Sequence, residues 1–128
     1  MNAHQKHLRT ASAKIIKILN SFRELDKHTE MGLGEAMVLL AIYEGEKDVY
    51  GGISAVDICN QRGWYHPTTM SRYVRSLARV DRQGRPGLNL VIQEEHPTSG
   101  RAKILKLSPA GHNFVSRLAD IVNGPVTP

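Results

Sequence analysis

Apolar residues recur at every third or fourth position over the first 26 residues of the chain, which is the spacing of one face of an α-helix. The stripe consists of Leu8, Ala11, Ile15, Ile18, Phe22 and Leu25, and Ile16 and Leu19 widen it. The pattern therefore predicts a long helix over about residues 3–26. A stripe this broad exceeds what one small core needs. We favour burial against a second copy of the chain over burial within the helix's own domain, because a seam of three heptads resembles a two-helix contact.

Two shorter helices are predicted next, each bounded by local signals. One covers about residues 34–43, with Met37, Leu40 and Ala41 as its inner stripe, although it is apolar nearly all round. The other covers about residues 55–61. Ser54 fits its N-cap and Gly63 its C-terminal stop. Ile53, just before this helix, is expected to form a strand of one or two residues.

A basic helix follows over about residues 67–79. Pro67 suits a first helical position, and His66 is the expected N-cap. The inner face is predicted to carry Met70, Tyr73, Val74 and Leu77, and the outer face Thr68, Thr69, Arg72, Arg75, Ser76 and Arg79. One side can thus pack on a core while the other presents hydroxyl and guanidinium groups.

The last third of the chain predicts a β-hairpin and a closing helix. Residues 88–93 alternate with period two, and the expected inward residues are Leu88, Leu90 and Ile92. Residues 102–107 are expected to form the second strand of the hairpin, and residues 96–101 form the turn between the two strands. Ser108 as N-cap and Pro109 in the first turn then begin a helix that ends near residue 124.

These elements together predict a mainly α protein with a small β-hairpin (α+β), in the order of a winged helix-turn-helix. We expect residues 1–128 to form a single domain. Within it, residues 1–30 form an N-terminal dimerisation helix, residues 34–107 the winged helix-turn-helix lobe and residues 108–124 a C-terminal helix. The two terminal helices are expected to form the dimer interface.

Charge changes this picture by pointing to a partner. Residues 62–85 carry six arginines and one aspartate, a net charge of +5, and this equals the net charge of the whole chain. The excess positive charge therefore lies in and around the basic helix. A basic helix that begins with hydroxyl side chains suits the phosphates and base edges of DNA, although charge runs more often mark only a solvated face.

Other chemistry is poorly supported by the residues. Cys59 is the single cysteine, and its apolar neighbours favour an inert thiol. The start of the chain lacks the apolar run of a signal peptide, no run suits a membrane span, and a cytoplasmic protein is expected. The histidines lack structural-zinc spacing and nucleophile motifs are missing. We therefore expect no metal, no cofactor and no enzyme.

Two segments carry a resemblance to the MarR family of bacterial transcription regulators. The run from His66 to Arg72 (HPTTMSR) is similar to the start of that family's recognition helix. The run from Leu107 to Gly111 (LSPAG) is similar to the segment that closes its wing. The resemblance implies that Arg101 is the wing-tip arginine that enters the minor groove. It covers roughly residues 10–122, and Ser99 stands where the family usually has an aspartate.

The sequence thus predicts a homodimeric, sequence-specific regulator of transcription that binds double-stranded DNA, with repression favoured. The expected DNA-binding residues are Tyr65, His66, Thr68, Thr69, Ser71, Arg72, Arg75, Arg79, Arg101 and Lys103. For Tyr65, core packing and phosphate contact are equally favoured interpretations. Two alternatives stay open: a winged-helix module that binds an acidic protein, and a replication or partition protein of a mobile element. A small-molecule effector is left open, and no residue identifies one.

Overall fold

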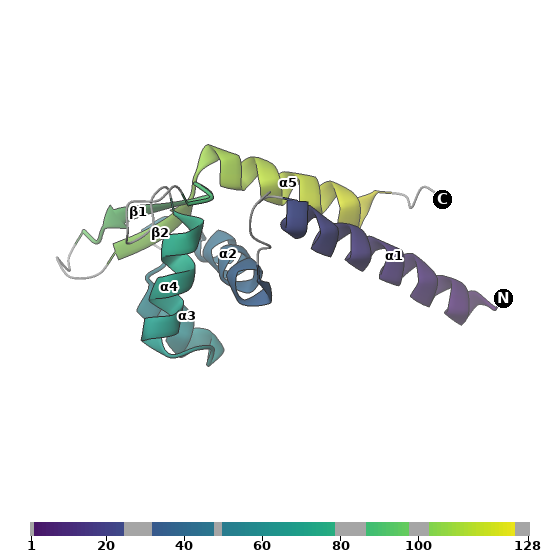
Figure 1. The fold of residues 1–128 in the computed structure, drawn as a ribbon, viewed down its shortest axis with the longest axis horizontal. Helices are drawn as coiled ribbons and strands as arrows, with labels where there is room; N and C mark the ends of the chain where they lie inside the picture. Colours follow the sequence, from purple (N-terminus) through teal and green to yellow (C-terminus); the bar gives the residue numbers. More distant parts are fainter. Residues whose placement is uncertain (1, 25–31, 48–49, 79–86, 98–102, 125–128) are drawn as a thin grey trace. The chain divides into compact units, whose positions relative to one another are not determined.

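The computed structural model describes residues 2–24, 32–47, 50–78, 87–97 and 103–124. Its elements are α1 (Ala3–Glu24), α2 (Leu33–Gly45), α3 (Ala55–Arg62), α4 (Pro67–Leu77), β1 (Val91–Glu95), β2 (Lys103–Leu107) and α5 (Pro109–Asn123) (Figure 1). This order confirms the predicted fold class, mainly α with a β-hairpin. The chain divides into two compact units, one from residues 1–31 and 114–128 and the other from residues 32–113.

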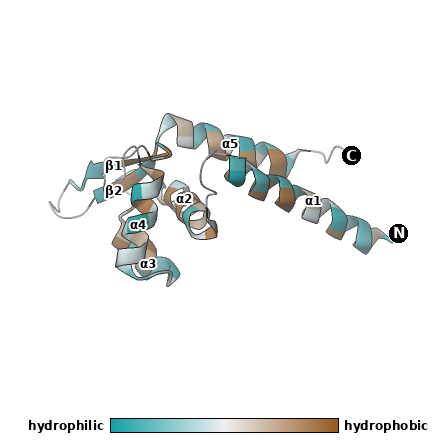
Figure 2. Cartoon of the chain, in the orientation of Figure 1, coloured by the Kyte–Doolittle hydropathy of each residue, from teal (hydrophilic) through white to brown (hydrophobic). Residues whose placement is uncertain are grey.

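The first unit joins α1 to the part of α5 that begins at Phe114. The rings of Phe22 and Phe114 meet edge to face with centroids 5.0 Å apart, and both side chains are buried. Farther along the pair, Lys14 Nζ donates to the carbonyl oxygen of Val122 at 2.9 Å. The predicted long helix is confirmed. However, residues 3–10 in its N-terminal turns are exposed, and Figure 2 shows polar and apolar residues interspersed along it.

The second unit is built on α2, which packs against α4 and β2. Val38, Leu39 and Ile42 are completely buried. The expected inner stripe of this helix was wrong in part: Ala41 is buried, but Leu40 is 39% exposed and Met37 is only half-buried. A helix that is apolar all round has no periodic signal to select the buried face.

The ends of α3 follow the predicted local chemistry. The Ser54 hydroxyl oxygen accepts a hydrogen bond from the Asp57 N–H at 3.1 Å. At the other end, Gly63 adopts φ +66°, in the left-handed region that glycine tolerates best, and its N–H donates to the Cys59 carbonyl oxygen. The expected short strand at Ile53 is also confirmed, as an antiparallel bridge to Leu105.

The hairpin starts three residues later than predicted. β1 and β2 pair antiparallel with Val91 opposite Leu107 and Glu95 opposite Lys103. Val91 is 2% exposed and Ile92 is 39% exposed, so the expected inward position of Ile92 was wrong. Leu90 and Val91 are buried in succession, so the alternation with period two begins only at Val91, and Asn89 before them has φ +55°.

The segment before β1 bonds to the C-terminal end of α4 instead of to a strand. The N–H groups of Leu88, Asn89 and Leu90 donate to the carbonyl oxygens of Ser76, Ala78 and Leu77. These are carbonyls that a helix end leaves without intrahelical partners. The base of the hairpin is therefore hydrogen-bonded directly to the end of the basic helix.

The start of α5 is fastened to the same segment. Ser108 is 4% exposed, and its hydroxyl oxygen accepts from the Gly111 N–H at 3.0 Å. The same hydroxyl donates to the Asn89 carbonyl oxygen at 2.7 Å. The predicted N-cap is confirmed, and it performs a second function because it also holds the chain ahead of β1.

Candidate nucleic-acid interface

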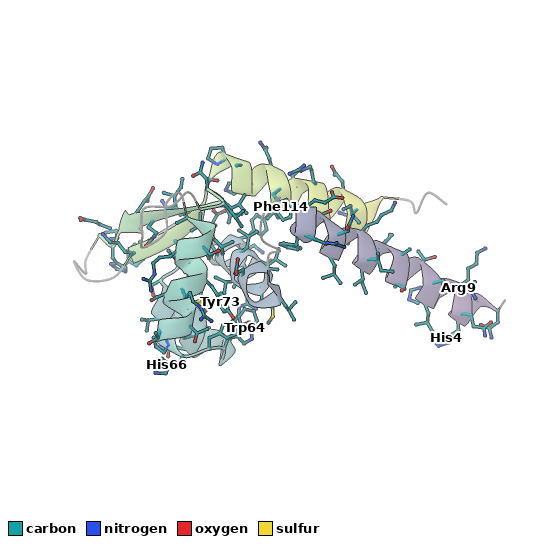
Figure 3. The ribbon with its side chains drawn as sticks, viewed as in Figure 1. His4, Arg9, Trp64, His66, Tyr73 and Phe114 are labelled. Atoms are coloured by element: carbon teal, nitrogen blue, oxygen red, sulfur yellow. The ribbon has the colours of Figure 1, made fainter. Side chains whose placement is uncertain are left out.

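The basic helix α4 begins as its sequence predicts. His66 has an extended backbone, and its Nδ1 accepts a hydrogen bond from the Thr68 N–H at 3.2 Å. Pro67 follows as the first helical residue, where the absence of an N–H costs nothing. Figure 3 shows His66 at the tip of α4, at the end remote from the hairpin. The N-cap leaves the Thr68 side chain and the imidazole exposed at a helix N-terminus.

The inner face of α4 fixes the helix on the core of its unit. Met70, Val74 and Leu77 are buried. Tyr73 is half-buried, and its ring lies 5.1 Å from the ring of Tyr65 at an angle of 73°. This packed face fixes how α4 is turned about its own axis. The opposite face of the helix therefore points away from the core of the unit.

Tyr65 and Trp64 form the turn between α3 and α4. Tyr65 has φ +44°, and its hydroxyl lies 3.7 Å from the Met37 sulfur. The structure therefore places Tyr65 in the packing between α4 and α2. The Trp64 ring meets the Tyr65 ring edge to face at 6.0 Å and carries the Arg62 guanidinium 5.3 Å above it, as expected for a residue that joins two helices.

The outer face of α4 carries five of the ten predicted DNA-binding residues. Thr68, Ser71 and Arg72 are exposed, and Thr69 and Arg75 are half-buried. Arg75 Nε donates to the Ser71 carbonyl oxygen at 3.2 Å, which directs the guanidinium back along the helix. The spacing of positions 68, 71, 72 and 75 places these four side chains on one helical face.

Ser76 does not belong to this outer face, so that prediction was wrong. Its hydroxyl donates to Glu35 Oε2 at 2.9 Å, and the bond is partly buried. Position 76 lies at the border between the two faces of the helix, where α2 approaches. Ser76 therefore joins α4 to α2.

A hollow of about 350 Å³ opens where α3, α4 and the hairpin meet. Its lining consists of Ser54, Ala55 and Val56 from the start of α3, Ser71, Val74 and Arg75 from α4, and Gln93, Lys103 and Leu105 from the hairpin. Three predicted site residues therefore share one concavity: Ser71, Arg75 and Lys103. The sequence did not predict that Gln93 and the start of α3 belong to this surface. The N-cap pattern at Ser54 predicted only where α3 begins.

Two ion pairs cross the hairpin. Lys103 Nζ lies 3.9 Å from Glu95 Oε1, with side chains 50% and 83% exposed. Lys106 Nζ lies 2.8 Å from Glu94 Oε2. Lys103 and Glu95 are directly opposite in the strand register, so both point to the same face of the hairpin, whereas Glu94 points to the other face.

Two predicted DNA-binding residues, Arg79 and Arg101, lie outside the described residues, as does the tip of the hairpin. Among the residues that the structure does describe, no group of three His, Cys, Asp or Glu side chains is arranged to hold a metal ion. None of the described helices combines the length and the apolar character needed to cross a membrane.

No protein-family model and no curated protein matches this sequence. Solved structures do match. A point mutant of MepR from S. aureus bound to an oligodeoxyribonucleotide has 18% identity and a TM-score of 0.68, over 96% of this chain and 78% of that chain. RV1404 from Mycobacterium tuberculosis has 21% identity and a TM-score of 0.60, over 91% and 69%. Wild-type MarR from E. coli in its apo form has 15% identity and a TM-score of 0.58, over 96% and 78%.

These likenesses concern the fold. The chain has the MarR-type winged-helix fold, and the resemblance that the sequence suggested is confirmed at that level.

Proposed function

We propose that this chain is a sequence-specific regulator of transcription that binds double-stranded DNA as a homodimer. The single observation that carries the proposal is the hollow at which Ser71 and Arg75 of α4 face Lys103 of the hairpin. A helix and a hairpin that present cationic groups to one concavity suit a DNA backbone that passes between two grooves. The structural likeness to a MepR mutant bound to an oligodeoxyribonucleotide supports the same partner.

In this proposal α4 enters the major groove. Thr68, Thr69, Ser71 and Arg72 lie at or beside the base edges, and the capping His66 stands next to the backbone. Arg75 contacts phosphate from the wall of the hollow, and Lys103 does so from the hairpin. Tyr65 acts through the packing that positions α4.

The roles of Arg79 and Arg101 rest on the sequence alone. Arg79 is proposed to contact phosphate, and Arg101 to reach the minor groove, where an arginine can read groove width.

The proposed homodimer is supported by the apolar residues that α1 leaves uncovered. Leu8, Ile15, Ile16 and Leu19 are between 51% and 63% exposed. Contiguous exposed apolar residues of this kind mark contact surfaces. A symmetric dimer implies a pseudo-palindromic DNA site whose half-sites lie about one helical turn apart. Repression is the favoured mode of action.

The proposal is tested by selecting preferred duplexes from a random pool and measuring affinity against salt concentration. If each subunit neutralises about four phosphates, the log–log slope should be roughly −7. Arg72→Gln should relax sequence choice. Arg75→Gln, which removes one phosphate contact from each subunit of the dimer, should weaken all duplexes alike and reduce the steepness by about 1.8. Lys6→Gln, which removes the same charge from an exposed turn of the other unit, should change little.

Salt-independent binding, or a selected pool without symmetry, would contradict this function. An absence of any shift with random duplex at low salt would favour the alternative of a winged-helix module that docks on an acidic protein. The alternative of a replication or partition protein shares the DNA-binding surface and would be separated by the genomic position of the selected site.

A further inference from the structure

Glu95 is a carboxylate on the face of the hairpin that the proposed function turns toward DNA. It stands opposite Lys103 in the strand register and two residues after Gln93 on the same strand, so all three side chains point to one face. Gln93 and Lys103 line the hollow with Arg75. An acid beside such a surface opposes the phosphates that the surface is proposed to hold.

The ion pair between Glu95 and Lys103 is loose. Its N–O distance of 3.9 Å is too long for a hydrogen bond, and the carboxylate is 83% exposed. Lys103 is therefore held near Glu95 by charge alone and can turn to another anion with little rearrangement. A DNA phosphate at the hollow would be such an alternative anion for Lys103, because its charged oxygens accept strong hydrogen bonds from an ammonium group.

We propose that Glu95 competes with a DNA phosphate for Lys103 and thereby limits the affinity and the salt dependence of DNA binding. The inference rests on the proposed function. In the free protein Glu95 offsets part of the charge of Lys103. In the complex Lys103 leaves Glu95 for phosphate, and the uncompensated carboxylate remains beside the backbone.

The hairpin supplies a matched control for the test. Glu94 is adjacent in sequence and carries the same charge, but its side chain belongs to the opposite face of the strand. It forms a closer pair with Lys106, at 2.8 Å. Glu94→Gln and Glu95→Gln alter net charge equally, so a difference between them reports position. At 0.15 M salt the screening length is about 8 Å, which confines the comparison to local charge.

The experiment measures the affinity of purified full-length chain for one fixed duplex, from the selected pool, across a range of salt concentrations. Glu95→Gln should bind more tightly than wild type, by up to about fivefold. It should also steepen the log–log salt slope by up to about 0.9 for each subunit, or about 1.8 for the dimer, because Lys103 is fully available. Glu94→Gln should change both quantities by less than half as much.

A double-mutant cycle with Lys103→Gln separates competition from simple repulsion. Competition predicts that Lys103→Gln loses more affinity in the Glu95→Gln background than in wild type. Additive effects, equal effects of the two glutamate variants, or weaker binding by Glu95→Gln would each overturn the inference. Failure of the wild-type chain to bind any duplex would instead overturn the proposed function, so the two failures are distinguishable.

Discussion

Gly34 in α2 is the position at which one added methyl group tests how tightly α2 and α4 are packed. An ideal Cβ at Gly34 would lie 2.6 Å from both Cζ and Oη of Tyr73 and 2.8 Å from its Cε2. Carbon atoms in ordinary contact are about 3.5–4.0 Å apart, so the ring would have to move by about 1 Å. The Tyr65 ring, 5.1 Å away, restricts that movement.

The expected magnitude is a balance of two effects. Glycine in a helix interior is destabilising by roughly 0.5–1 kcal/mol relative to alanine. Gly34 lies in the first turn of α2, so an unhindered Gly34→Ala would stabilise the protein by at most about that amount. Overpacking of a filled site costs about 1–3 kcal/mol. We therefore expect Gly34→Ala to lower the free energy of unfolding by up to about 2.5 kcal/mol.

The assay is urea unfolding at a fixed protein concentration, followed by circular dichroism, with the midpoint and the slope compared between variants. The control is the same substitution in a Tyr73→Leu background, where the ring is absent. There Gly34→Ala should raise the free energy of unfolding by up to roughly 1 kcal/mol. Stabilisation by Gly34→Ala in the wild-type background would refute the reasoning, because it would mean that the ring yields without cost.

Three further outcomes are expected. Ser54→Ala should lower the free energy of unfolding by about 1 kcal/mol, because the Asp57 N–H loses its acceptor, whereas Ser54→Asp should preserve it; equal urea midpoints for the two variants would argue against the cap. Ser108→Ala should cost about 1–3 kcal/mol in the same assay, since one buried hydroxyl serves both Gly111 and Asn89; a loss no larger than that of an exposed control, Ser116→Ala, would contradict this. Leu19→Asp should shift sedimentation from dimer toward monomer because Leu19 is 51% exposed on α1; Thr10→Asp, on the opposite side of the helix, should leave the dimer intact.

The parts of the fold that sequence predicted well depend on short-range chemistry. Ser54, Gly63 and Ser108 mark helix ends because each forms its bond with a residue three or four positions away. Neighbours in sequence are enough to specify such bonds. The elements and their order follow from these signals together with the helical spacing of apolar residues.

The errors arose where a choice depends on distant residues. The buried face of α2 is decided by α4 and β2, and no periodicity in α2 records that decision. The phase of β1 follows from its pairing with β2, in which Val91 lies opposite Leu107, and the pattern of apolar residues does not reveal that pairing. Ser76 turns to Glu35, 41 residues away.

The candidate site was predictable in its members and not in its shape. The basic, hydroxyl-rich face of α4 is visible in the sequence, as is the cationic hairpin. Their convergence on one hollow depends on the strand register, which sets Gln93 opposite Leu105 and Glu95 opposite Lys103. The sequence predicted strands over residues 88–93 and 102–107 without a register, so the place of Glu95 beside Lys103 was not foreseen.

The three amides of residues 88–90 that close the end of α4 have a mechanical consequence. They join the helix to the base of the hairpin by backbone hydrogen bonds, and Ser108 fastens the same segment from the other side. In the described part of the chain these bonds hold the base of the hairpin at the end of α4, so we expect the helix and the hairpin to move together. A duplex that engages both would then adapt its groove spacing to their separation, and stiff sequences would be disfavoured by the elastic cost of bending them.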